Sequence, residues 1–146
     1  MEEFNRKAGV LWTGDLKTGK GLVSTESKAL FELPFSYPTR FADEVGLNPE
    51  ELLAAAHAAC FSMSVASTLA KNDYTPVQTE TTATCTLASK EGGGHEVTNM
   101  RLHVRCEVPG LDEDTFNRLV MEADESCPFS NLLRNALNIE ITTALI

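Results

Sequence analysis

The sequence predicts an α+β fold with a largely antiparallel sheet. Strand patterns are grouped along the chain rather than alternating strictly with helices, which argues against a doubly wound parallel sheet. One long uncharged segment, residues 52–70, separates two groups of strands, and its composition predicts a central helix that is buried on most faces. No repeat, linker or low-complexity tract divides the 146 residues. We therefore expect one domain over residues 1–146.

The first third of the chain is expected to form three short strands. They centre on residues 10–12, 22–24 and 29–32. Pro34, Pro38 and Gly46 then predict an irregular loop over about residues 33–47. Arg40 lies in that segment.

The start of the central helix carries a clear sequence signal. Asn48 is a good N-cap, Pro49 suits the first helical position, and Glu51 stands three residues after the cap, as in a capping box. The helix is expected to continue to about Lys71, where Asn72 would end it.

The remaining elements follow from periodicity. Alternation with period two predicts two strands, a helical spacing of apolar residues predicts one helix, and Cys127-Pro128 predicts the start of a shorter one. The expected ranges are 78–87 and 100–108 for the strands, 112–125 and 127–137 for the helices, and 139–146 for a closing strand.

Composition excludes several classes of function. The formal net charge is −9, so a phosphate backbone or an anionic membrane surface would be repelled. Residues 52–70 have about the length of a bilayer span, but Ala, Ser and Thr make them a poor one. The N-terminus has no apolar run behind its charges, so we expect a cytoplasmic protein with reduced thiols.

The four cysteines fall into two pairs. Cys85 and Cys106 lie in phase with apolar strand residues, which is typical of small buried hydrophobic side chains. Cys60 lies among small helical residues, and composition alone leaves its role open. Cys127 precedes Pro128 and so occupies an N-cap position, where the helix dipole stabilises a thiolate. A purely structural capping role for Cys127 remains an alternative.

Two motifs resemble the OsmC/Ohr family of hydroperoxide-reducing proteins. The first is Asn48-Pro49-Glu50-Glu51-Leu52 with Ala55-Ala56-His57-Ala58-Ala59-Cys60-Phe61-Ser62-Met63, and the second is Cys127-Pro128-Phe129-Ser130. The likeness extends over nearly the whole chain. It is closer to the OsmC branch, which places an arginine in the later loop, as Arg40 does here. The first hairpin turn, where Ohr proteins carry that arginine, holds only Lys17 and Lys20.

The resemblance implies an OsmC-like fold and an intertwined homodimer with active sites at the interface. It also implies a thiol-dependent peroxidase that reduces organic hydroperoxides or hydrogen peroxide in oxidative or osmotic stress. By the same resemblance Cys60 is the reactive thiol, Cys127 the second thiol, and Glu50 the family's glutamate.

This chemistry makes definite demands on the residues. A Cys60 thiolate would attack the O–O bond, and Cys127 would condense with the resulting sulfenic acid. Arg40 is the candidate cation for thiolate and peroxide. An external dithiol, such as a lipoyl protein, thioredoxin or a small thiol, would reduce the disulfide. The scheme requires no metal, flavin or haem.

Glu50 is expected to orient Arg40 through a bidentate ion pair. The alternative is that it only stabilises the helix N-terminus. Ten residues of helix span about 15 Å, so Glu50 cannot touch Cys60 of its own helix. Either Arg40 spans this gap or Glu50 acts in the partner subunit's site, and we hypothesise the second.

Three other functions are alternatives to a peroxidase. His57 precedes Cys60 by three residues, which invites a Cys–His acyl-transfer enzyme, but no orienting acid or oxyanion hole accompanies the pair. A zinc site is disfavoured because no CxxC pair occurs. A non-catalytic module that binds small hydrophobic ligands is disfavoured, because it would need neither Cys60 and Cys127 nor Arg40.

Overall fold

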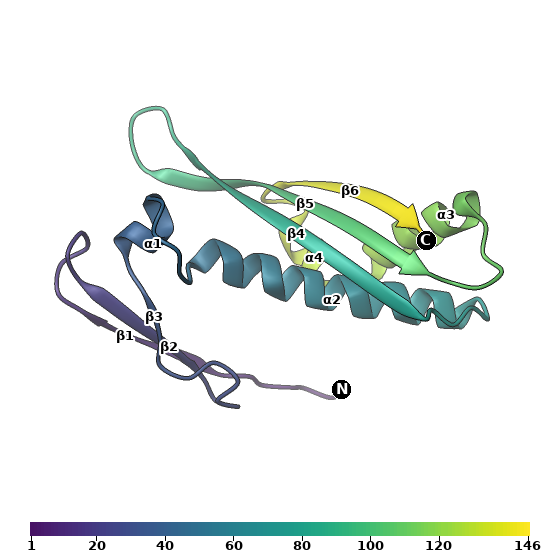
Figure 1. The fold of residues 1–146 in the computed structure, drawn as a ribbon, viewed down its shortest axis with the longest axis horizontal. Coiled ribbons are helices and arrows are strands. Elements are labelled where there is room, and N and C mark those ends of the chain that lie inside the picture. The colour runs from purple at the N-terminus through teal and green to yellow at the C-terminus, as the bar shows by residue number, and fades with distance from the viewer. The chain divides into compact units, whose positions relative to one another are not determined.

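The computed structural model describes residues 1–146 and confirms the α+β class (Figure 1). The chain forms two compact units, Met1–Leu52 and Leu53–Ile146, and each contains its own three-stranded sheet. The longest helix, α2 (Pro49–Lys71), begins at the end of the first unit and continues into the second. That the whole chain acts as one domain stays a prediction.

The first unit is built on an antiparallel sheet of β1 (Ala8–Thr13), β2 (Lys20–Thr25) and β3 (Leu33–Phe35), in that order. The first two strands lie where the sequence predicts them. The third was wrongly expected over residues 29–32. Lys28 and Glu32 have φ values of 61° and 49°, in the left-handed region that extended strands do not use, so pairing begins only after Glu32.

The segment expected to be an irregular loop contains a short helix, α1 (Tyr37–Phe41). Ser36 caps it: its hydroxyl accepts a hydrogen bond from the Thr39 N–H, and the Thr39 hydroxyl accepts one from the Ser36 N–H at 2.9 Å. Pro38 lies in the first turn, where its missing N–H costs nothing. Arg40 therefore lies on a helix rather than in a loop.

The N-terminus of α2 agrees with the sequence prediction. The Asn48 side chain accepts a hydrogen bond of 2.9 Å from the Glu51 N–H. The helix was expected to be buried on most faces, but within one chain it is buried along one face. The buried side chains are those of Ala54, His57, Phe61, Val65, Thr68 and Leu69. This is the one helix long and apolar enough to span a membrane by length and composition.

The second unit contains β4 (Gln78–Ser89), β5 (His95–Glu107) and β6 (Asn138–Leu145), with β5 in the centre. The β4–β5 pair is antiparallel, whereas β6 runs parallel to β5. The turn between β4 and β5 has three consecutive glycines with positive φ, Gly92, Gly93 and Gly94, so β5 begins five residues earlier than the alternation predicts.

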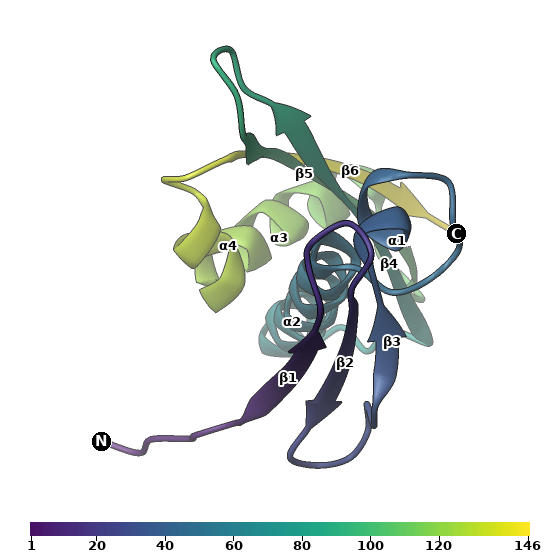
Figure 2. The ribbon, with the colours of Figure 1, turned by 90° about the vertical axis from the view of Figure 1, so that its left-hand side faces the viewer.

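Two helices complete the second unit, α3 (Glu113–Ser126) and α4 (Pro128–Leu133). Figure 2 shows α3 and α4 on the same side of the second sheet as α2. Phe61 of α2, Leu102 of β5 and Phe116 of α3 meet in one core, and all three are fully or almost fully buried. This packing fixes the part of α2 that carries Cys60 against the start of α4.

Candidate active site

Cys60 and Cys127 lie side by side in the second unit. A hydrogen bond of 3.6 Å joins their sulfur atoms. Cys60 is partly exposed on α2, whereas Cys127 is fully buried between α3 and α4. A disulfide needs an S–S distance of about 2.05 Å, so a displacement of about 1.5 Å would allow a bond. The two thiols selected from the sequence are thus brought together, and only Cys60 is open to a small oxidant.

The surroundings shift the pKa values of the two thiols in opposite directions. Burial pushes the pKa of Cys127 upward, but the Ser130 N–H and hydroxyl, Cys60 and the Phe129 N–H outweigh it, so this pKa lies below its ordinary value. The Cys127 sulfur accepts no capping hydrogen bond of ordinary length, and the N–H groups act on it as nearby dipoles.

Burial raises the pKa of Cys60 above its ordinary value, the Phe129 N–H offsets part of this, and Cys127 adds to the rise. Within this unit the negative charge therefore favours Cys127, while the thiol that can meet an oxidant keeps its proton. An accessible Cys60 thiolate needs a further positive charge.

The other two cysteines take structural places in the sheet. Cys106 is fully buried, donates a hydrogen bond of 3.4 Å to the Thr79 hydroxyl, and has its pKa raised by burial. Cys85 is partly buried against the same core, opposite Met100 on the neighbouring strand. Their expected role as small core side chains is confirmed for Cys106, and Cys85 is less buried than expected.

Arg40 and Glu50 form an ion pair in the first unit. The Arg40 Nη2 donates to Glu50 Oε1 at 2.7 Å, and Nε lies 3.2 and 3.3 Å from the two carboxylate oxygens. The Glu50 side chain is 13% exposed and that of Arg40 35%, so the guanidinium is held in place with one side open to solvent. This is the bidentate geometry that the sequence predicts.

A pocket of about 340 Å³ opens beside this ion pair. Arg40 contributes its one charged side chain, and the guanidinium also lies 4.9 Å from the centre of the Phe41 ring. The other walls are mainly apolar: Trp12, Leu16, Phe35, Ser36, Tyr37, Phe41 and Pro49. Such a pocket suits an apolar group attached to an oxygen that the guanidinium can bind.

A buried polar cluster in the second unit was missed by the sequence analysis. His57 Nε2 and the Ser130 hydroxyl are 2.8 Å apart, and both residues are fully buried. Burial lowers the pKa of His57, Asp124 raises it, and Arg134 lowers it. The signal was present in the second motif, because Ser130 stands three residues after an N-cap and so faces the capping side chain.

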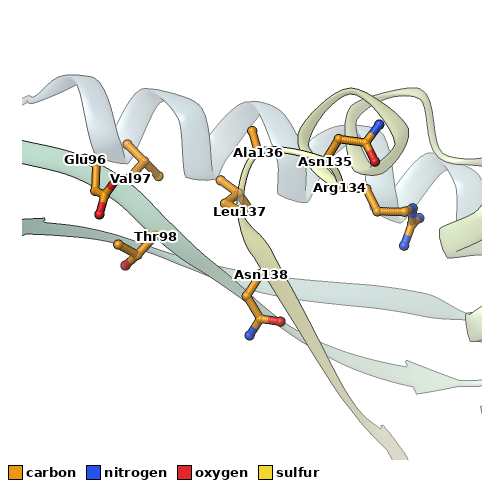
Figure 3. Close-up of a pocket in the computed structure, with 8 residues that line it drawn as sticks. All are labelled: Glu96, Val97, Thr98, Arg134, Asn135, Ala136, Leu137 and Asn138. Carbon is orange, nitrogen blue, oxygen red and sulfur yellow. The ribbon is translucent and has the colours of Figure 1, made fainter.

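Asp124 and Arg134 complete this cluster. The Asp124 carboxylate is 5% exposed and forms an ion pair of 3.0 Å with Arg134. Arg134 also lines a polar pocket of about 370 Å³ between the start of β5 and the α4–β6 connection (Figure 3). That pocket contains no thiol, so we do not assign redox chemistry to it. No group of three or more His, Cys, Asp and Glu side chains is arranged to hold a metal ion.

Comparisons with known proteins agree with these motifs. The pattern of the family described as OsmC-like protein matches residues 42–142. Peroxiredoxin OsmC of Escherichia coli is 41% identical over 137 residues, which cover 94% of this chain and 95% of that protein. The organic hydroperoxide resistance protein of Xanthomonas axonopodis pv. citri is 31% identical over 100 residues, 68% of each chain.

Solved structures extend the likeness to the fold. The crystal structure of an organic hydroperoxide resistance protein from Elizabethkingia anophelis superposes with a TM-score of 0.79 at 26% identity, over 100% of both chains. OhrB of Bacillus subtilis gives a TM-score of 0.75 at 25% identity, over 94% of this chain and 97% of that one. The chain belongs to the family of OsmC-like proteins.

Proposed function

We propose that this protein is a peroxidase that reduces hydroperoxides through a redox cycle of Cys60 and Cys127. The observation that carries the proposal is the 3.6 Å approach of two sulfurs, one accessible and one buried. The names of the relatives, a peroxiredoxin and organic hydroperoxide resistance proteins, support the same class of reaction.

In the first step the Cys60 thiolate attacks the outer oxygen of the hydroperoxide. The O–O bond breaks, a sulfenic acid forms on Cys60, and the leaving alkoxide takes up a proton to become an alcohol. In the second step the Cys127 sulfur displaces the sulfenic oxygen as water and forms a disulfide with Cys60. An external dithiol then restores both thiols by exchange, starting at the accessible sulfur.

Arg40 is the proposed source of the positive charge that the Cys60 thiolate requires. A guanidinium stays charged at all relevant pH values and has donors for both the sulfur and a peroxide oxygen. Glu50 is the group that holds it, through the ion pair of 2.7 Å. We further propose that the protein is a cytoplasmic homodimer in which Arg40 and Glu50 serve the partner subunit's thiols.

The proposed substrate class is organic hydroperoxides. The pocket beside Arg40 is walled mainly by aromatic and aliphatic side chains. It would take the apolar group of such a substrate, which hydrogen peroxide lacks.

Turnover of cumene hydroperoxide with dithiothreitol tests the proposal. Cys60→Ser is expected to abolish turnover, because a hydroxyl cannot form the sulfenic acid. Cys85→Ser is the matched control, since it removes a partly buried thiol that lies outside the pair. Equal turnover of wild type and Cys60→Ser would refute the peroxidase assignment.

Mass spectrometry of the oxidised protein tests the pairing. After one equivalent of hydroperoxide, a peptide that links Cys60 to Cys127 is expected. A link between Cys85 and Cys106 would show that the thiols have been assigned wrongly.

A further inference from the structure

The buried Ser130 hydroxyl is hydrogen-bonded to His57 and lies three residues, about one helical turn, after Cys127. Cys127, Ser130 and His57 are each 0% exposed. The Ser130 hydroxyl lies 2.8 Å from His57 Nε2, and the same hydroxyl stabilises the charged form of the Cys127 sulfur. Ser130 therefore stands between a sulfur that must lose a proton and an imidazole that can take one.

The serine hydroxyl has a single hydrogen, so the path has two complete arrangements. In the first, the Cys127 S–H turns from the Cys60 sulfur, to which it donates at 3.6 Å, to the Ser130 hydroxyl, and Ser130 donates to His57 Nε2. In the second, His57 Nε2–H donates to Ser130 and Ser130 donates to the Cys127 thiolate. The two differ by one proton moved from sulfur to imidazole, with no change in the position of any heavy atom.

We propose that Ser130 and His57 form a proton relay for Cys127, which takes its proton as the sulfur attacks oxidised Cys60 and returns it when the disulfide is reduced. The inference rests on the proposed peroxidase function and assigns a role to His57 that differs from a Cys60–His57 nucleophile. His57 lies three residues from Cys60, but its Nε2 hydrogen bond leads to Ser130 and so towards the other thiol.

Each proton that leaves a group during the catalytic cycle is returned by its end. As the Cys127–Cys60 bond forms, the Cys127 proton passes to Ser130 and the Ser130 proton passes to His57 Nε2. The S–O bond of the sulfenic acid breaks, and the departing hydroxide takes a proton from water at the accessible side of Cys60. When an external dithiol attacks Cys60, Cys127 leaves as a thiolate and recovers its proton from His57 through Ser130.

The charged neighbours of His57 suit both states of the imidazole. Burial keeps it neutral at rest, and in the tautomer with the proton on Nδ1 the Nε2 atom can accept. Asp124 of α3 favours the imidazolium that forms, while Arg134, after α4, opposes it and is paired with Asp124 at 3.0 Å. On α2 the nearest titrating neighbour along the same side is Cys60.

Single-turnover kinetics of the full-length protein separate the two steps. Reduced protein is mixed with one equivalent of cumene hydroperoxide. Formation of the Cys60 sulfenic acid is followed by trapping with dimedone, and the disulfide is followed by mass after an acid quench. Three variants, Ser130→Ala, Ser130→Thr and His57→Gln, are compared with Ser126→Ala, a neighbouring serine whose hydroxyl donates to the Ala123 carbonyl instead.

We expect Ser130→Ala and His57→Gln to slow disulfide formation by about 10²-fold while sulfenic acid formation changes by less than about threefold. Ser130→Thr keeps the hydroxyl and should restore the second step, and Ser126→Ala should match wild type. The wild-type rate of disulfide formation should fall as pH drops and His57 becomes charged. In His57→Gln the fall should begin at higher pH, because the rate then follows ionisation of the Cys127 thiol itself.

Two results would overturn the relay. The first is a wild-type rate of disulfide formation in Ser130→Ala, and the second is an equal slowing of both steps in all three variants, threonine included, which would mean that the cluster only supports the fold. Failure of the peroxidase proposal looks different, since wild type itself would then form no sulfenic acid at Cys60.

Discussion

At the scale of single residues, the two sulfurs form one titrating pair, because a proton on either changes the charge felt by the other. Burial and Cys127 together hold the pKa of Cys60 above its ordinary value. Replacing Cys127 by serine removes the contribution of the second sulfur. The pKa of Cys60 is therefore expected to fall, and the Cys60 thiolate should appear at lower pH.

The rate of alkylation by iodoacetamide against pH measures this shift. The midpoint for Cys60 in Cys127→Ser should lie at lower pH than in wild type, with the modified residue identified by peptide mass. In Cys85→Ser the midpoint of Cys60 alkylation should be the same as in wild type. A midpoint that moves to higher pH would mean that Cys127 stabilises the Cys60 thiolate, contrary to the raised pKa of Cys60 described above.

The identity of the reacting residues was accessible from the sequence, but their relative acidity was not. The position of Cys85 and Cys106 in phase with apolar strand residues predicted a structural role for both. The two motifs indicated Cys60 and Cys127 as the reacting thiols. Which thiol carries the charge depends on burial and on N–H groups of a helix that packs beside α2, and neither is visible in a one-dimensional pattern. The pairing of Ser130 with His57 was missed because the two residues lie 73 positions apart in the sequence.

At the scale of elements, sequence prediction succeeded where a local signal is complete. The cap at Asn48 and the uncharged run behind it predict α2 closely. It failed for α1, because Thr39 replaces the Glu or Gln of the usual capping box and two prolines suggest a loop. The parallel pairing of β6 with β5 could not be predicted from a local signal, because it depends on a connection through α3 and α4.

Helix α3 allows a quantitative test of the core. Its apolar residues have helical spacing, and Phe116 is fully buried where α3 meets α2 and the sheet. Phe116→Ala is expected to lower the free energy of unfolding by about 3–5 kcal/mol, from lost burial and the cavity left behind. Met121→Ala on the same helix removes a side chain that is 51% exposed and should cost less than about 0.5 kcal/mol.

Urea unfolding followed by far-UV circular dichroism measures both α3 variants. The midpoint should move for Phe116→Ala with an unchanged slope, and should stay nearly fixed for Met121→Ala. Equal midpoints for the two variants would show that α3 does not contribute its buried face to the cooperative core.

At the scale of the whole molecule, a single chain leaves large apolar side chains exposed. Val10 and Leu11 of β1 are 58% and 64% exposed, and Met63 of α2 is 75% exposed. Apolar surface of this kind is usually covered by another chain. It supports the proposed homodimer, and it explains why burial of α2 on most faces is not met within one chain.

Complementation between inactive subunits tests whether Arg40 and Glu50 serve the partner's thiols. Cys60→Ser lacks the reactive thiol, and Arg40→Ala lacks the cation, so each homodimer should lose at least about 10²-fold in peroxidase rate. When both variants are co-expressed with different tags and the mixed dimer is isolated, one site regains an intact Cys60 and an intact Arg40 from opposite chains. The mixed dimer should then recover about half of the wild-type rate, since one of two symmetric sites is restored. A mixed dimer no faster than the Arg40→Ala homodimer would place Arg40 with the thiols of its own chain. A monomer in analytical sedimentation would contradict the proposed homodimer.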